Sequence, residues 1–198
     1  MELRYERGKM EIKGKVVSQL DEFVLEFTDI LEKLTDYVIV GGYVAILLGR
    51  SRGTEDIDTI VRDMKAEEFS SLYRKLCDNG YYFLNAGGED KLYRMLKDGL
   101  RIRAAREGTV IPNIKLKFVR NHLDLYAIEN RVKVVFGGRH VFISPIELQI
   151  PYKLYLGSEK DVEDAVYLWE IFKDKIDPDI MAGFMRALGV RGDQYGIR

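Results

Sequence analysis

The hydrophobic pattern of the chain switches between helical and strand spacing. From Lys15 to Leu34 apolar residues recur every three or four positions, which predicts an amphipathic packing helix. Similar spacing, with proline, serine or glycine at the ends, predicts helices over residues 66–79, 90–97, 145–156, 158–172 and 178–188. Pro151 falls inside one of them and is expected to break or kink it. The polar, glycine-bearing segment after residue 188 is expected to be poorly ordered.

Shorter apolar or alternating runs predict the strands. They cover residues 37–40, 56–61, 81–84, 114–119, 131–136 and 140–144, while 100–104 fits a strand or a helix end. This order predicts an α/β (α+β) fold, in which a small mixed sheet is flanked by helices and C-terminal helices pack on the core. We expect a single domain over residues 1–198, with a core over about 15–144 and a helical C-terminal portion over about 145–190.

Composition narrows the class of protein. The 198 residues are 46% hydrophobic, enough for one sizeable core, and 31 Lys+Arg against 32 Asp+Glu give a net charge of -1. Global charge therefore does not indicate nucleic-acid binding, although local basic patches remain open. One cysteine, Cys77, excludes an internal disulfide, and no run predicts a signal peptide or membrane span. We expect a cytoplasmic protein, and the high charged content is typical of a thermophile.

Candidate chemistry is concentrated between residues 37 and 61. A glycine pair, Gly41 and Gly42, ends a predicted strand and opens a helix, where unpaired backbone N–H groups favour an anion. Further on, Asp56 and Asp58 project from one face of the next strand and repel each other unless a cation lies between them. Oxygen ligands suit Mg²⁺ or Mn²⁺. An anion site and a cation site one strand apart suit a nucleoside triphosphate.

The loop between these two features is basic. Arg50 and Arg52 are candidates for contacts with triphosphate or an acceptor, but a solvated loop explains them equally well. Thr54 is a candidate for a hydrogen bond to phosphate or for capping the second strand. The sequence leaves each of these pairs of alternatives open.

The order apolar-Gly-Gly, thirteen-residue spacer, Asp-apolar-Asp-apolar resembles the signature of the DNA polymerase beta-like nucleotidyltransferase superfamily. The segment Lys160-Asp161-Val162-Glu163-Asp164 is similar to the small archaeal and bacterial branch related to abortive-infection toxin nucleotidyltransferases. The resemblance implies that Asp56 and Asp58 are the metal ligands and that Gly41 and Gly42 seat the triphosphate.

The resemblance also implies further nucleotide contacts. Lys153 occupies a position similar to family positions that face the nucleotide, although a lysine snorkelling from a packed helix is a comparable reading. Two interpretations are open for Lys160, Asp161 and Asp164. They stabilise the start of a helix electrostatically, or they lie near the nucleotide.

The chain departs from the family pattern at the third carboxylate. The superfamily normally brings an acid on a strand near residues 114–119, where this chain has lysines. The nearest acid is Asp124. Either Asp124 reaches the site as a catalytic residue, or a lysine takes over charge stabilisation, or catalysis is impaired. A helix N-cap or surface position explains Asp124 as well.

The expected activity is therefore Mg²⁺-dependent transfer of a nucleoside monophosphate from an NTP to a hydroxyl acceptor, with tRNA or protein as candidate acceptors. Two alternatives stay open, the first of them because the third acid is missing. One is an impaired nucleotide-binding or regulatory module, and the other a toxin–antitoxin component with this fold. A globular α/β domain with coincidental glycines and aspartates is the remaining interpretation.

Overall fold

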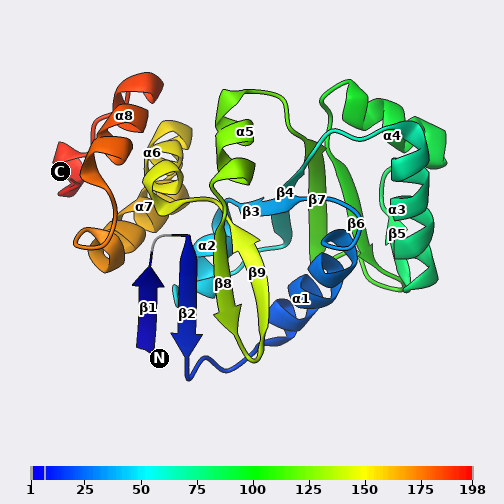
Figure 1. Ribbon diagram of the computed structural model, residues 1–198, viewed down its shortest axis with the longest axis horizontal. Helices are drawn as coiled ribbons and strands as arrows, with labels where there is room; N and C mark the ends of the chain where they lie inside the picture. Colours follow the sequence, from blue (N-terminus) through cyan, green and yellow to red (C-terminus); the bar gives the residue numbers. More distant parts are fainter. Residues whose placement is uncertain (1, 7, 198) are drawn as a thin grey trace.

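The structure is a computed structural model that describes residues 2–6 and 8–197. Its strands are β1 (Glu2–Glu6), β2 (Lys9–Lys13), β3 (Tyr37–Val40), β4 (Asp56–Val61), β5 (Tyr81–Phe83), β6 (Ile102–Arg106), β7 (Asn113–Phe118), β8 (Val132–Phe136) and β9 (Arg139–Ile143). They form one mixed sheet in the order β1-β2-β8-β9-β3-β4-β7-β6-β5, which Figure 1 shows running across the molecule. The predicted mixed sheet flanked by helices is confirmed, and it is larger than expected.

The helices are α1 (Gln19–Leu31), α2 (Gly42–Leu47), α3 (Ala66–Asp78), α4 (Glu89–Lys97), α5 (His122–Glu129), α6 (Ile146–Leu156), α7 (Glu159–Phe172) and α8 (Pro178–Leu188), followed by the 3-10 turn η1 (Asp193–Tyr195). Helices α6, α7 and α8 pack together beside the β1–β2 end of the sheet, while α3 and α4 lie at the β5 end (Figure 1). Among the described residues, no helix combines the length and the apolar character needed to cross a bilayer.

Alternation along the central strands divides the core between the two faces of the sheet. Ile39 of β3 and Ile57 of β4 belong to the main core, which includes the apolar faces of α1, α2, α3 and α4. Val38 and Ile60 point to the opposite face and join a smaller cluster with Ala127 of α5 and neighbours from α6. This smaller cluster covers only the Ile60 end of β4, so the Asp56 end of the same face is left free of apolar cover.

The N-terminal part of the chain differs from the prediction. The helix predicted from Lys15 begins at Gln19, because Ser18 caps it: its hydroxyl accepts from the Asp21 N–H at 3.1 Å, and the Asp21 carboxylate accepts from the Ser18 N–H. The β1–β2 hairpin was not predicted. Charged residues in both strands weaken the pattern of alternating apolar and polar positions. Strand β2 joins the sheet by pairing in parallel with β8, a partner more than 120 residues away in sequence.

Two expectations for the remaining chain need correction, and one open alternative is decided. Segment 100–104, which fitted a strand or a helix end, contains the start of strand β6 at Ile102. Helix α6 continues through Pro151, so the expected break is wrong; nearly every residue from Ile146 to Leu154 is buried, and packing holds the helix on both sides of the proline. The C-terminal tail, expected to be poorly ordered, packs on the protein, because the side chain of Ile197 is 1% exposed and belongs to the main core.

Candidate functional site

The two aspartates lie where predicted, on one face of β4. Ile57 and Thr59 are buried on the opposite face, whereas the side chains of Asp56 and Asp58 remain 32% and 33% exposed. Because the apolar cover of this face begins only at Ile60, both carboxylates reach solvent. The same alternation along β4 that buries Ile57 therefore exposes Asp56 and Asp58 to solvent.

The glycine turn approaches the second of these aspartates. Gly41 has φ 76° and ψ −144°, a conformation open essentially to glycine, and it precedes the first turn of α2. A Cβ atom at Gly41 would lie 3.1 Å from Oδ2 of Asp58. The carbonyl of Gly41 accepts a hydrogen bond of 2.9 Å from the side-chain amide of Gln149 on α6. The turn and the acid thus share one opening, held from the other side by α6.

A cavity of about 180 Å³ occupies this opening. Its polar lining includes Gly41, Asp58, Lys115, Lys117, Asp124 and Tyr152. Apolar side chains from β4, α5 and α6 form the other part of the wall, namely Ile60, Leu123, Ala127, Leu148 and Leu156. Ligand pockets commonly combine an apolar wall with a few converging polar groups.

Two lysines of β7 enter the same site. Lys115 stands opposite Asp58 in the parallel pairing of β4 with β7, and its Nζ lies 2.5 Å from Oδ2 of Asp56. Burial alone raises the pKa of Asp56, but hydrogen bonds from Lys115 and Asn113 and the charge of Arg103 outweigh it, so the pKa is lowered. The ammonium of Lys115 therefore favours the ionised form of Asp56.

Asp124 lines the cavity from the first turn of α5. The cap of that helix is Asn121, whose side chain accepts from the Asp124 N–H at 2.8 Å. Both carboxylate oxygens of Asp124 accept hydrogen bonds from Lys117, at 2.7 and 2.8 Å, and one also accepts from the Arg120 N–H at 3.1 Å. These contacts orient Lys117 in the cavity. Direct participation of Asp124 in catalysis stays a prediction.

The predicted phosphate ligands Arg50, Arg52 and Lys153 converge on a different group, the carboxylate of Asp164 on α7. The Asp164 side chain is fully buried, and it accepts from Arg50, from Arg52 at 2.5 Å and from Lys153 at 2.6 Å. Lys153 is itself 1% exposed and also lies 3.1 Å from Asp161. Burial lowers the pKa of Lys153, although Asp161 opposes that shift.

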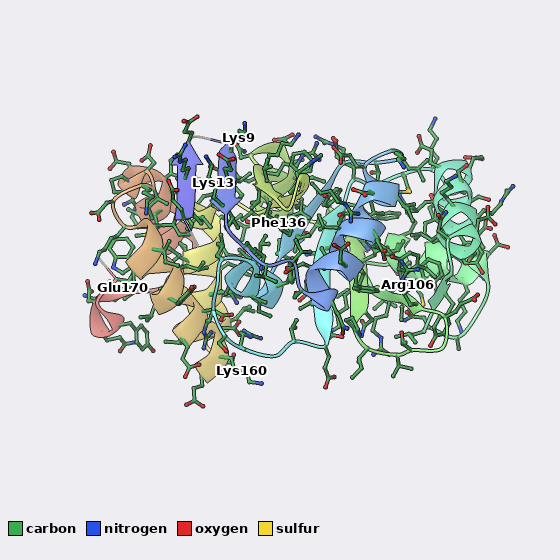
Figure 2. The ribbon with its side chains drawn as sticks, turned by 90° about the horizontal axis from the view of Figure 1, so that it is seen from below. Lys9, Lys13, Arg106, Phe136, Lys160 and Glu170 are labelled. Carbon is green, nitrogen blue, oxygen red and sulfur yellow. The ribbon has the colours of Figure 1, made fainter. Side chains whose placement is uncertain are left out.

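Arg52 is the member of this group that also borders the glycine turn. A Cβ atom on Gly42 would lie 2.9 Å from a terminal nitrogen of its guanidinium. Thr54 has a local role, because its hydroxyl donates to the carbonyl of Asp56 at 2.8 Å at the start of β4. The side chain of Lys160 is exposed in the first turn of α7 (Figure 2). Its backbone carbonyl accepts a hydrogen bond from Arg50.

The structure therefore brings Gly41, Asp58 and Asp124 to one cleft, and Asp56 lies beside it through its contact with Lys115. It gathers Arg50, Arg52 and Lys153 around Asp164, with Arg52 next to the glycine turn. Among the cavity residues that sequence reasoning missed are Gln149 and Arg101. Gln149 carried no signal because it lies within a predicted apolar helix. A guanidinium nitrogen of Arg101 lies 3.9 Å from Oδ1 of Asp58, a proximity that depends on the pairing of β6 with β7.

Comparisons with known proteins place this architecture. No family model matches the sequence, and no curated protein is significantly similar to it. The solution structure of the antibiotic-resistance factor ANT(2'')-Ia matches with a TM-score of 0.55 and 14% identity, over 91% of this chain and 95% of that chain. The chain has the nucleotidyltransferase fold.

Two further structures share the nucleotidyltransferase fold with this chain. An antigenic nucleotidyltransferase-like protein from Paracoccidioides brasiliensis matches with a TM-score of 0.53 and 17% identity, over 89% of each chain. ANT(2'')-Ia in complex with adenylyl-2''-tobramycin matches with a TM-score of 0.52 and 17% identity, over 89% of this chain and 97% of that chain. The predicted resemblance to nucleotidyltransferases is confirmed at the level of fold.

Replacing Gly41 with alanine tests the close approach of the turn to Asp58. We expect Gly41→Ala to lower the free energy of unfolding by about 1–3 kcal/mol, because the backbone is strained for any L side chain and the methyl group presses on the carboxylate. Urea denaturation measures the change. Gly138→Ala is the matched control, since Gly138 has the same φ of 76° but open space around its Cβ position. Equal losses in the two variants would show that the contact with Asp58 is unimportant.

Proposed function

We propose that the protein binds a nucleoside triphosphate with Mg²⁺ in the cleft between β4, β7, α5 and α6, and transfers its nucleoside monophosphate to a hydroxyl acceptor. The observation that carries the proposal is the 3.1 Å approach of the Gly41 Cβ position to Asp58. A turn that presents backbone N–H groups to an anion and a carboxylate suited to a cation then face the same ligand. A magnesium-bound polyphosphate satisfies both.

The acidic residues fit one divalent ion. Mg²⁺ in nucleotide sites is commonly held by one or two carboxylates together with phosphate oxygens and water, and Asp56 and Asp58 supply two carboxylates on one strand face. Within residues 2–6 and 8–197, no group of three His, Cys, Asp or Glu side chains is placed to hold a metal. When bound, Mg²⁺ or Mn²⁺ would polarise the phosphate oxygens and offset the negative charge of the leaving group.

The remaining cavity residues suit the parts of a nucleotide. Lys117 and Arg101 are cationic groups in the wall that can donate to phosphate oxygens. Tyr152 and the apolar side chains of α5 and α6 offer a surface on which a base can stack. Asp124 holds Lys117 by two hydrogen bonds, and Gln149 fixes the carbonyl of Gly41, so the donors are oriented before the ligand arrives.

The reaction follows from this arrangement. The acceptor hydroxyl loses its proton to water, and its oxygen forms a bond to the α-phosphorus as the bond from that phosphorus to the bridging oxygen breaks. Pyrophosphate leaves with the electron pair of the broken bond. The chain contributes by aligning acceptor and triphosphate and by surrounding the phosphates with positive charge. The adenylyl-2''-tobramycin bound by ANT(2'')-Ia, a protein of the same fold, supports transfer to a hydroxyl of the acceptor.

A second function is favoured by one specific contact. Lys115 stands where a third carboxylate is expected and pairs with Asp56 at 2.5 Å. A protein that binds the nucleotide and signals through it without turnover would tolerate this arrangement. The choice of tRNA or protein as acceptor, a toxin–antitoxin setting and a cytoplasmic location remain proposals.

Nucleotide binding and transfer are tested separately. Calorimetry with each NTP and Mg²⁺ should show binding, and incubation with α-labelled NTP and cellular RNA or protein should give a labelled acceptor with release of pyrophosphate. Binding without incorporation or pyrophosphate release would favour the regulatory module. Failure of every NTP to bind in the presence of Mg²⁺ would contradict both functions.

A further inference from the structure

Lys115 occupies a central position between the two aspartates. It projects from β7 into the cleft, directly opposite Asp58 in the strand pairing, and its ammonium contacts the carboxylate of Asp56. The side chain is 27% exposed, so it reaches solvent together with the acids. The ammonium thus neutralises Asp56, which reduces the repulsion between the two carboxylates of this strand face.

The surrounding charge opposes the binding of several metal ions. Arg103 stands opposite Lys115 on β6, and its charge acts on Asp56, while Arg101 approaches Asp58. Two carboxylates therefore face three cationic side chains. A second divalent ion would need further oxygen ligands, and the described part of the chain provides no third carboxylate beside the pair. It would also be repelled by the ammonium of Lys115.

We infer that Lys115 is a built-in positive charge that replaces a second metal ion, so that the site takes one divalent ion with its nucleotide. The inference rests on the proposed function for its ligand. The ammonium has three N–H donors, one of which suffices for Asp56, and the others are available for phosphate oxygens. Lys115 is fixed in the chain, whereas a second ion would have to be bound from solution.

The stoichiometry of Mn²⁺ binding tests this inference without measuring activity. The protein is titrated with Mn²⁺ in the presence of a saturating α,β-methylene analogue of the preferred NTP, and free ion is followed by electron paramagnetic resonance. A blank that contains the analogue alone gives the Mn²⁺ bound by free analogue, which is subtracted. We then expect one bound Mn²⁺ per wild-type chain. Lys115→Asp, which supplies a third carboxylate in place of the ammonium, should bind two. Lys133→Asp on β8, a strand lysine outside the cavity lining, is the matched control and should bind one.

Each outcome decides a separate point. Two ions in the wild type overturn the inference but leave the proposed function standing. One ion in both the wild type and Lys115→Asp overturns the claim that Lys115 excludes the second. Absence of both nucleotide and ion binding overturns the proposed function and the inference with it.

A second variant covers the case in which Lys115→Asp does not fold, as judged by circular dichroism. Lys115→Gln removes the charge without adding a carboxylate. Because the ammonium repels the neighbouring ion, its removal should tighten the binding of the single Mn²⁺ roughly tenfold. An unchanged dissociation constant would overturn the inference.

Discussion

Asp58→Asn is expected to lower nucleotidyl transfer by about 10³-fold while leaving the fold intact. A metal ligand in a phosphate site supplies several kcal/mol of transition-state stabilisation, and each 1.36 kcal/mol corresponds to a factor of ten in rate. An asparagine keeps the size of the side chain but loses its charge. Because Asp58 is 33% exposed and its ion pair with Arg101 is long, at 3.9 Å, little folding energy depends on it. Initial rates of pyrophosphate release and thermal melting measure the two effects.

Asp63→Asn provides the control for this prediction. Asp63 follows β4 in the chain but pairs with Lys97 at 2.7 Å, outside the cavity lining, so its rate should stay at the wild-type level. Wild-type transfer by Asp58→Asn or Asp56→Asn would contradict a mechanism in which these carboxylates hold the ion. A loss of melting temperature matching the loss of rate would instead show that Asp58 is structural.

The elements around the acids were predictable because their signals are local. Alternation in residues 56–61 places Asp56 and Asp58 on one face, and the glycine pair ends one strand and opens one helix. Each signal lies within a few residues, and tertiary packing has no reason to override it. The two features share an opening because β3 pairs with β4, which places Val40 beside Asp58.

The contacts of the basic residues were not predictable from spacing. Arg50 and Arg52 sit more than 110 residues before Asp164, and nothing in either segment indicates that they meet. The sequence also leaves the partner of Lys115 open, because the parallel register of β7 with β4 depends on the whole sheet. Long-range charge pairing of this kind needs the three-dimensional fold, whereas a buried apolar face is already visible in its periodicity.

The partnership at Asp164 leads to the second large expected effect, this time on stability. Asp164→Asn should lower the free energy of unfolding by about 3–5 kcal/mol, the typical loss when one partner of a buried ion pair is removed. The variant leaves the ammonium of Lys153, 1% exposed, beside Arg50 and Arg52 without its closest carboxylate. For a chain of this size that corresponds to a fall in melting temperature of about 10 °C. Urea denaturation and thermal melting give both quantities.

Glu163→Gln is the matched control, because Glu163 also pairs with Arg50 from α7 but is 55% exposed. Its loss should stay within about 1 kcal/mol, since exposed ion pairs contribute little. Adding Lys153→Met to Asp164→Asn removes the surplus buried charge, and the double variant should recover part of the stability. A loss below about 1 kcal/mol in Asp164→Asn would contradict a structural role for the pair. Since the loop between α2 and β4 carries both arginines, a loosened loop should also weaken nucleotide binding at the glycine turn.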